Sequence, residues 1–107
     1  MALYKVFDSE KAFGYKQITT FYADFGIAEI FGISAIKDTY KRSFDAWKYD
    51  YKYLTELVMV LNWKIWEHFK TNPELAEVYQ TLWDKARKYA VDNLKGVELD
   101  YYYKTTN

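Results

Sequence analysis

Side chains that commonly perform catalysis are scarce in this sequence. It contains one histidine, His68, no cysteine and twelve tyrosines, none of which stands out by its neighbours. His68 falls on the apolar face of an expected helix, together with Leu57 and Leu61. An imidazole there acts as a general base only if a carboxylate reaches it, and the adjacent Glu67 is expected to point about 100° away. We therefore expect His68 to be a hydrogen-bonded residue of the core or of a helix end.

Patterns for a metal or a cofactor are equally scarce. The residues around His68 on its helix, Lys64, Ile65, Thr71 and Asn72, do not form a set of metal ligands. The absence of cysteine removes disulfides, zinc knuckles, iron–sulfur clusters and thiol nucleophiles. A glycine-rich phosphate loop, a nucleophile elbow and a paired Glu-x-x-His motif are also missing. We expect a protein that is not an enzyme, with no catalytic residue, no metal and no cofactor.

Composition predicts a single domain over residues 1–107. Half of the residues are apolar and 28% are charged, which is typical of globular proteins. The 15 basic and 15 acidic residues cancel, and this balance disfavours nucleic acid as a partner. The start of the sequence lacks a signal-peptide pattern, and the longest apolar run, residues 57–61, is too short to cross a membrane. These features predict a soluble cytoplasmic protein that does not bind membranes.

Aromatic residues make up 21% of the chain, whereas it has four glycines and one proline. Large rings can fill a core, and few helix breakers allow long helices. We expect a mostly α-helical bundle of three to four helices. The first helix begins with Thr19 or Thr20 as its cap and ends before Gly32. Its apolar residues recur at helical spacing, at Phe21, Phe25, Ala28 and Phe31.

The next helical segment spans residues 34–70, with Ser34 as its cap. Two apolar stripes share one helical phase: Ile36, Tyr40, Phe44, Trp47 and Tyr51, then Leu54, Leu57, Val58, Leu61 and Ile65. The shared phase permits one helix of about 36 residues, about 54 Å long. Typical helix lengths favour a bend or break near Asp50. Both versions stay open.

Signals at both ends define the last expected helix. Asn72 caps it, Pro73 takes the first helical position and Gly96 follows its far end. Its apolar face comprises Leu75, Val78, Tyr79, Leu82, Ala86, Tyr89 and Ala90. The two ends of the chain alternate instead like strands and predict a short terminal β-ribbon, formed by Tyr4 and Val6 with Val97, Leu99, Tyr101 and Tyr103.

A second apolar stripe on the central segment is the candidate protein interface. Met59, Trp63 and Trp66 stand at positions i, i+4 and i+7, on the side opposite Leu54 and Leu61. Tryptophan often anchors protein interfaces because it buries a large area. The stripe is covered either within the domain or by another chain, including a second copy in a dimer.

A line of lysines, Lys37, Lys41, Lys48 and Lys52, runs beside the main apolar stripe. It is either a solvated face or a guide for acidic partners. The segment around Ala28, Gly32 and Ser34 resembles the first half of a helix-turn-helix. Asp38 and Lys41 then occupy positions at which that motif buries apolar residues. A nucleic-acid-binding regulator is therefore the alternative to a protein-binding module.

Two stretches, residues 36–42 and 53–66, are similar to short uncharacterised proteins encoded on bacterial prophage-type mobile elements. The similarity extends through residues 93–96 and covers most of the chain. It implies a small bacterial or phage protein that acts in the cytoplasm as a regulator or inhibitor of a host system. The leading hypothesis is a non-enzymatic module that binds a protein partner or self-associates. A structural component of a phage particle is a further alternative.

Overall fold

The computed structural model describes residues 15–106, with side chains from Ile18 onward, and this part of the chain is all-helical. Its five helices are α2 (Tyr15–Phe31), α3 (Ile33–Trp47), α4 (Tyr51–His68), α5 (Pro73–Asn93) and α6 (Val97–Thr106). The expected mostly α-helical fold is confirmed, with one helix more than the expected maximum in the described part. None of the described helices is both long and apolar enough to cross a membrane.

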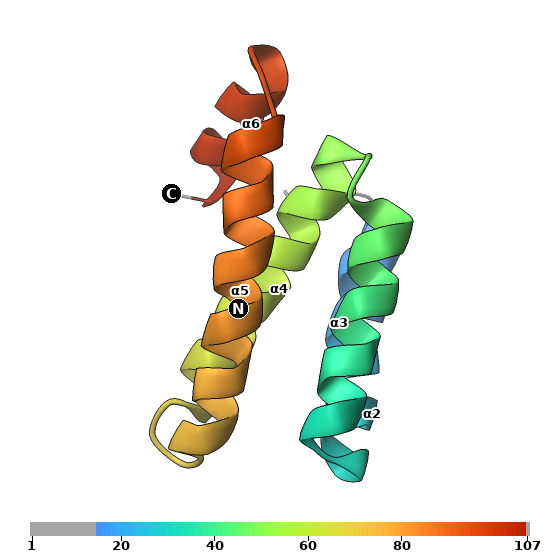
Figure 1. Ribbon diagram of the computed structural model, residues 1–107, viewed down its shortest axis with the longest axis vertical. Coiled ribbons are helices and arrows are strands. Elements are labelled where there is room, and N and C mark those ends of the chain that lie inside the picture. Colours follow the sequence, from blue (N-terminus) through green and yellow to red (C-terminus); the bar gives the residue numbers. More distant parts are fainter. Residues whose placement is uncertain (1–14, 107) are drawn as a thin grey trace.

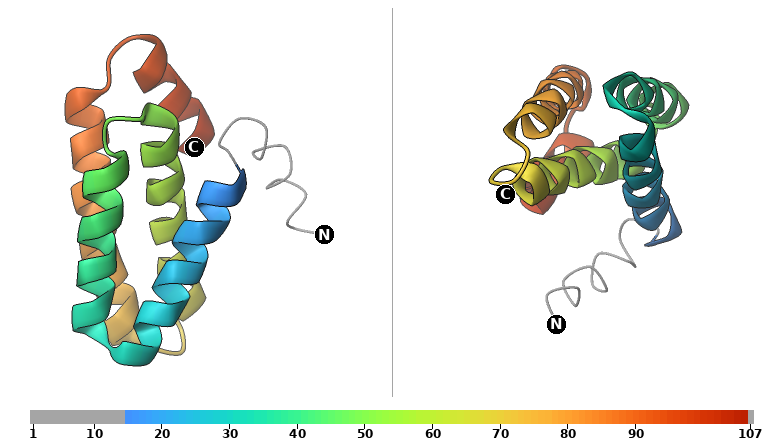
Figure 2. Two further views of the ribbon diagram at one scale, coloured as in Figure 1. Left: turned by 90° about the vertical axis from the view of Figure 1, so that its right-hand side faces the viewer. Right: turned by 90° about the horizontal axis from the view of Figure 1, so that it is seen from below.

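Helix α4 is the central element and contacts α2, α3, α5 and α6. Helices α4 and α5 pack along each other, and α2 and α3 form a hairpin beside this pair, with both helices in contact with α4 and α3 also in contact with α5 (Figure 1). The short α6 lies at the end of the molecule where α5 finishes, and it packs against α4 and α5 (Figures 1 and 2). The hairpin therefore presents an outer face that α4 does not cover.

The chain turns sharply at two places between residues 31 and 51. Gly32, with φ 118°, separates α2 from α3 in a backbone conformation that favours glycine. Ser34 therefore lies inside α3, and the expectation that it caps this helix is wrong. Asp50 begins α4, because its side chain accepts hydrogen bonds from the backbone N–H groups of Lys52 (3.0 Å) and Tyr53 (3.3 Å). The version of the prediction with a break near Asp50 is thus confirmed.

Helix α5 begins as its sequence signals predict. The Asn72 side chain accepts a hydrogen bond from the Leu75 backbone N–H, and Pro73 stands at the first helical position. Helix α2, by contrast, starts before Thr19 and Thr20, so neither residue is its cap. Ile18 is buried one turn before Phe21, and this contact with the core favours a longer helix.

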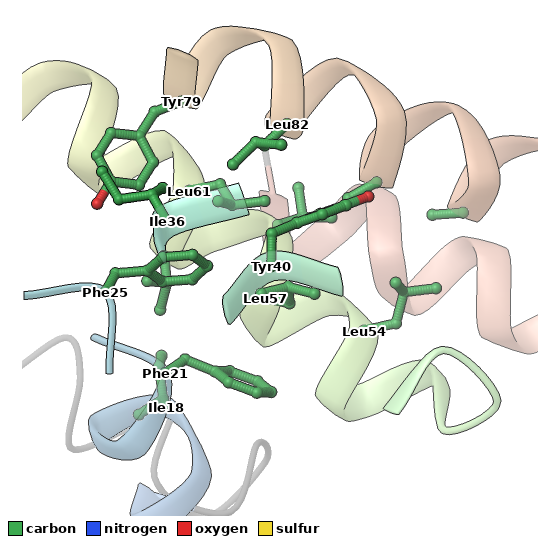
Figure 3. Close-up of a cluster of buried hydrophobic side chains, with 14 of the residues drawn as sticks. Ile18, Phe21, Phe25, Ile36, Tyr40, Leu54, Leu57, Leu61, Tyr79 and Leu82 are labelled. Atoms are coloured by element: carbon green, nitrogen blue, oxygen red, sulfur yellow. The ribbon is translucent and has the colours of Figure 1, made fainter. Parts of the chain in front are cut away.

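The core lies between the hairpin, α4 and α5 (Figure 3). Phe21 and Phe25 approach it from α2, while Tyr79 and Leu82 approach it from α5 (Figure 3). The Phe25 and Tyr79 rings meet edge to face at 5.7 Å. Among the described residues, the largest fully buried side chains are Tyr79, Phe21, Phe25, Lys64, Ile36, Leu54, Leu57, Leu61, Glu56, Val58, Val60 and Thr55. Aromatic residues thus join α2 to α5 across α4.

The terminal β-ribbon is wrong for its C-terminal half, since Val97–Thr106 is helix α6. Tyr4 and Val6 lie outside the described residues. Leu99 and Tyr102, which is not part of the alternating set, stand one helical turn apart, and both pack against the core. Glu98 and Asp100 favour the N-terminal turn of a helix electrostatically. Packing against α4 and α5 therefore outweighs the weak strand signal.

Candidate functional site

A cluster of charged and polar side chains joins three helices around Glu29. The carboxylate oxygen Oε2 of Glu29 accepts a 2.5 Å hydrogen bond from the Tyr79 hydroxyl on α5. The same oxygen lies 3.1 Å from Lys64 Nζ and 3.1 Å from His68 Nε2, both on α4. One carboxylate on α2 thus holds α4 and α5 together.

A second carboxylate, that of Glu67, closes the outer side of the cluster. Its Oε2 lies 3.3 Å from Lys64 Nζ and 3.3 Å from His68 Nε2, and its Oε1 accepts a hydrogen bond from the Tyr22 hydroxyl. The Tyr22 ring lies 4.3 Å from Lys64 Nζ, in cation–π geometry. The expectation that Glu67 points away from His68 is wrong, because its carboxylate lies within reach of the His68 ring nitrogen.

Opposite charges of this cluster meet where they are least hydrated. Lys64 is 2% exposed, and it contacts both carboxylates. Burial acts to raise the pKa of Glu29, but the hydrogen bonds from Tyr79 and Lys64 outweigh it and lower this pKa. Burial and the bond to Glu29 raise the pKa of Tyr79. The hydrogen bond to Glu67, followed by burial, raises the pKa of Tyr22 to about 12. Both phenols are therefore neutral donors at physiological pH.

Three of these residues offer a mixed oxygen and nitrogen donor set. One ligand atom each of Glu29, Glu67 and His68 lies within 4.8 Å of the others. The Lys64 ammonium already contacts both carboxylates, and a metal ion at this place would have to displace it. We conclude that the cluster acts as an ionic clasp between α2, α4 and α5, with Lys64 as its cation. His68 is hydrogen-bonded next to the core, as expected from the sequence.

The members of the candidate interface Met59, Trp63 and Trp66 lie in different surroundings. Met59 lines a groove of about 360 Å³ between α4, α5 and α6. Trp63 is half-buried and packs against the core. Trp66 is 67% exposed, and its ring contacts that of Phe69 at 5.5 Å. Of the three residues, only Trp66 offers most of its side chain to solvent, and the interface itself stays a prediction.

The lysine line is divided between two helices, since Lys52 belongs to α4. Lys37 and Lys41 line a groove of about 490 Å³ between α3 and α5, together with Lys85 and Glu77. Lys48 lies 3.7 Å from Asp45 and near the rings of Phe44 and Tyr49. The line thus supplies one small basic group, Lys37 and Lys41, and the negative charge of Glu77 in the same groove weakens its positive potential.

A further surface, absent from the sequence predictions, lies on the outer face of the α2–α3 hairpin. Ile27, Ile30 and Phe31 are 56%, 80% and 77% exposed. The stripe prediction placed Phe31 in the core, but the residue lies at the end of α2, where the chain turns away. Ile27 and Phe31 also line a groove of about 590 Å³ between α2 and α3. The left view of Figure 2 faces this hairpin, whose helices diverge from the Gly32 turn.

The two walls of this α2–α3 groove differ in side-chain size and charge. Helix α2 contributes Thr20, Phe21, Asp24, Ile27, Ala28 and Phe31, whereas α3 contributes Ala35, Asp38, Thr39, Arg42, Ser43, Ala46 and Trp47. The Arg42 guanidinium lies 3.4 Å from Thr39 Oγ1. In the described part of the chain, Asp24, Asp38 and Arg42 make no ion pair. The groove therefore combines an apolar edge with unpaired charges of both signs.

No family model, curated protein or solved structure shows significant similarity to this chain. The resemblance to prophage-type proteins therefore stays a prediction from the sequence, and function must be argued from the side chains described above.

Proposed function

We propose that this protein is a non-enzymatic helical protein-binding module, a small accessory protein of bacterial or phage origin. It acts in the cytoplasm as a regulator or inhibitor, through contacts with protein. The origin and the cytoplasmic location rest on the sequence alone. The observation that carries the binding function is the exposure of Ile27, Ile30 and Phe31 beside the α2–α3 groove.

Single exposed apolar residues are common on protein surfaces, but this group is adjacent in space. Ile27 and Phe31 are one helical turn apart on α2, and Ile30 lies beside them. Large apolar groups that gather at a groove are typical of protein-binding surfaces. The groove's open form and its apolar edge suit a helix of another protein better than a small molecule.

The ionic clasp supports this function by holding the apolar edge in place. Glu29 lies between Ile27 and Ile30 in the sequence of α2, on the side that faces α4 and α5. Its bonds to Tyr79 and Lys64 fix the end of α2 against the core. A surface ordered before binding loses less conformational entropy on binding.

The test is site-specific photo-crosslinking in the native host cell. A photoreactive residue replaces Ile30, and in the control it replaces Val97 on α6, which is equally exposed at 81%. We expect a covalent protein adduct at position 30, not at position 97, and its loss when Phe31→Asp is added. No adduct at position 30, or the same adducts at both positions, would contradict the proposal.

A second candidate, a nucleic-acid-binding regulator, is favoured by the basic group in the groove between α3 and α5. Lys37, Lys41 and Lys85 line this groove, and two of them belong to α3, the helix after the Gly32 turn. Three lysines close together can contact phosphates. Glu77 in the same groove opposes this, so we place the function second.

A further inference from the structure

We infer that the occupant of the α2–α3 groove is a second copy of this chain, packed so that α2 of each protomer covers α3 of its partner. This inference rests on the proposed function, since it names the partner of the same surface. The two-fold axis would run between the protomers, roughly parallel to the hairpin helices. Each copy would contribute α2 and α3 as one layer. The two layers would pack face to face, with each α2 antiparallel to the α3 of the partner.

Side-chain size supports this arrangement. The α2 wall carries the large residues Ile27 and Phe31, five and one residues before the Gly32 turn, whereas Ala35 on the α3 wall, three residues after the turn, is small. A rotation about this axis brings the α2 wall of one copy over the α3 wall of the other. Large side chains then face small ones at both symmetric positions, and this is the fit that close helix packing requires. A face of uniformly large residues would not be complementary to itself.

Charge supports the same axis. Asp24 lies on α2 and Arg42 on α3, eight and ten residues from the Gly32 turn, so both stand at a similar height along the hairpin. Rotation about an axis parallel to the helices preserves that height. Arg42 then lies opposite the partner's Asp24, and Asp24 lies opposite the partner's Arg42. Two equal ion pairs form from residues that are unpaired within the described part of one chain.

The size of the hairpin predicts a reversible dimer. Helix α2 has 17 residues, which gives a length of about 25 Å. Two helices about 10 Å apart give a face about 20 Å wide, so the footprint is roughly 500 Å² per protomer. Stable interfaces usually bury about 800 Å² per partner. The expected dissociation constant is therefore about micromolar or weaker.

Sedimentation velocity of the full chain tests the dimer, from about 1 µM to several hundred µM. We expect a concentration-dependent shift from monomer to dimer. Asp24→Arg and Arg42→Asp should each weaken dimerisation by at least about tenfold, because each creates two like-charge contacts. The double variant Asp24→Arg with Arg42→Asp should restore the wild-type affinity. The control Asp84→Arg, on the exposed side of α5, should leave dimerisation unchanged.

Restoration by the double variant is the decisive result. These positions are exposed, and unchanged far-UV circular dichroism would show that the variants fold. A monomer at every concentration, or a double variant that remains as weak as the single ones, overturns the inference. If the chain is monomeric but position 30 still crosslinks to another protein, the second copy is refuted while the proposed binding function stands. If neither association occurs, both fail.

Discussion

The Tyr79 hydroxyl on α5 donates a 2.5 Å hydrogen bond to the carboxylate of Glu29 on α2, fifty residues earlier in the chain. Lys64 and His68 of α4 contact the same oxygen. The bond therefore completes a clasp through three helices and fixes the end of α2. Ile30 and Phe31, the exposed apolar residues, follow Glu29 directly, so the interior of the protein positions its proposed binding surface.

Removal of this hydroxyl should cost stability. Tyr79→Phe keeps the ring and its edge contact with Phe25 but leaves Glu29 without one donor. Buried hydrogen bonds to charged groups contribute about 1.5–3 kcal/mol, so we expect the free energy of unfolding to fall by that amount. Urea denaturation measures it. The exposed Tyr49 offers a matched control, and Tyr49→Phe should change stability by less than about 0.5 kcal/mol. Equal effects of the two variants would refute the role of the clasp.

The lowered pKa of Glu29 predicts that the folded protein loses part of its stability at acid pH. The unfolded chain protonates this carboxyl near its ordinary pKa of 4.5, whereas the folded state keeps it ionised to lower pH. Its contribution to stability is therefore complete above about pH 4.5 and is lost as pH falls through the folded pKa. Wild type should be more stable than Glu29→Gln at pH 7, and this difference should shrink below pH 4.5. Urea melts of both proteins between pH 7 and 3 measure it, and a constant difference would contradict the assignment.

Glu56 predicts the opposite dependence on pH. It is fully buried on α4, and neither of its carboxyl oxygens has a hydrogen-bond partner among the described residues. Burial, with a smaller contribution from Asp50, raises its pKa from 4.5 to about 9. Folding thus takes up a proton between these values, and stability should fall as pH rises from about 4.5 to about 9, by up to about 1.4 kcal/mol per unit.

The variant Glu56→Met should remove this slope, since methionine has a similar length and does not titrate. At pH 8 we expect its free energy of unfolding to exceed that of wild type by at least about 1 kcal/mol, because the unpartnered polar group is gone. At pH 4.5 the gain should be smaller. A pH-independent effect of the substitution would show that Glu56 does not hold a proton in the folded protein.

Substitutions of the two tryptophans of the candidate interface should differ in their effect on the free energy of unfolding. Trp63 packs against the core, so Trp63→Ala should cost about 2–4 kcal/mol. Trp66 is mostly exposed, and Trp66→Ala should cost less than about 1 kcal/mol through loss of its contact with Phe69. Chemical denaturation measures both. Loss of partner binding by Trp66→Ala at unchanged stability would place an interface at Met59, Trp63 and Trp66, instead of on the α2–α3 hairpin.

The basic group of Lys37 and Lys41 allows a test of the alternative function, nucleic-acid binding. If α3 binds nucleic acid, Lys37→Gln with Lys41→Gln should weaken binding to a DNA duplex and reduce the dependence of affinity on salt by about two ion equivalents. Fluorescence anisotropy at low and moderate salt measures both quantities. Lys95→Gln, at an exposed position between α5 and α6, serves as the control. Absence of binding to DNA and RNA at low salt would remove this function.

The sequence by itself predicted helix for most of the chain up to Gly96 and placed several helix ends. Asn72 and Pro73 define the start of α5, and Asp50 starts α4, because caps act on backbone groups within one turn. Apolar spacing identified much of the core, from Phe21 and Phe25 on α2 to Tyr79, Leu82, Ala86 and Ala90 on α5. These signals are local, so a single sequence carries them.

Only the tertiary structure decided which helices meet and which faces stay open. It turned residues 97–106 into a helix by packing Tyr102 inward, and it left Phe31 exposed although its spacing matches the core. It also joined Glu29 to His68 and Tyr79, which lie 39 and 50 residues away. Spacing along one helix relates residues a few positions apart. Contacts between helices depend on how each turn aims the next helix, and no local pattern encodes that direction.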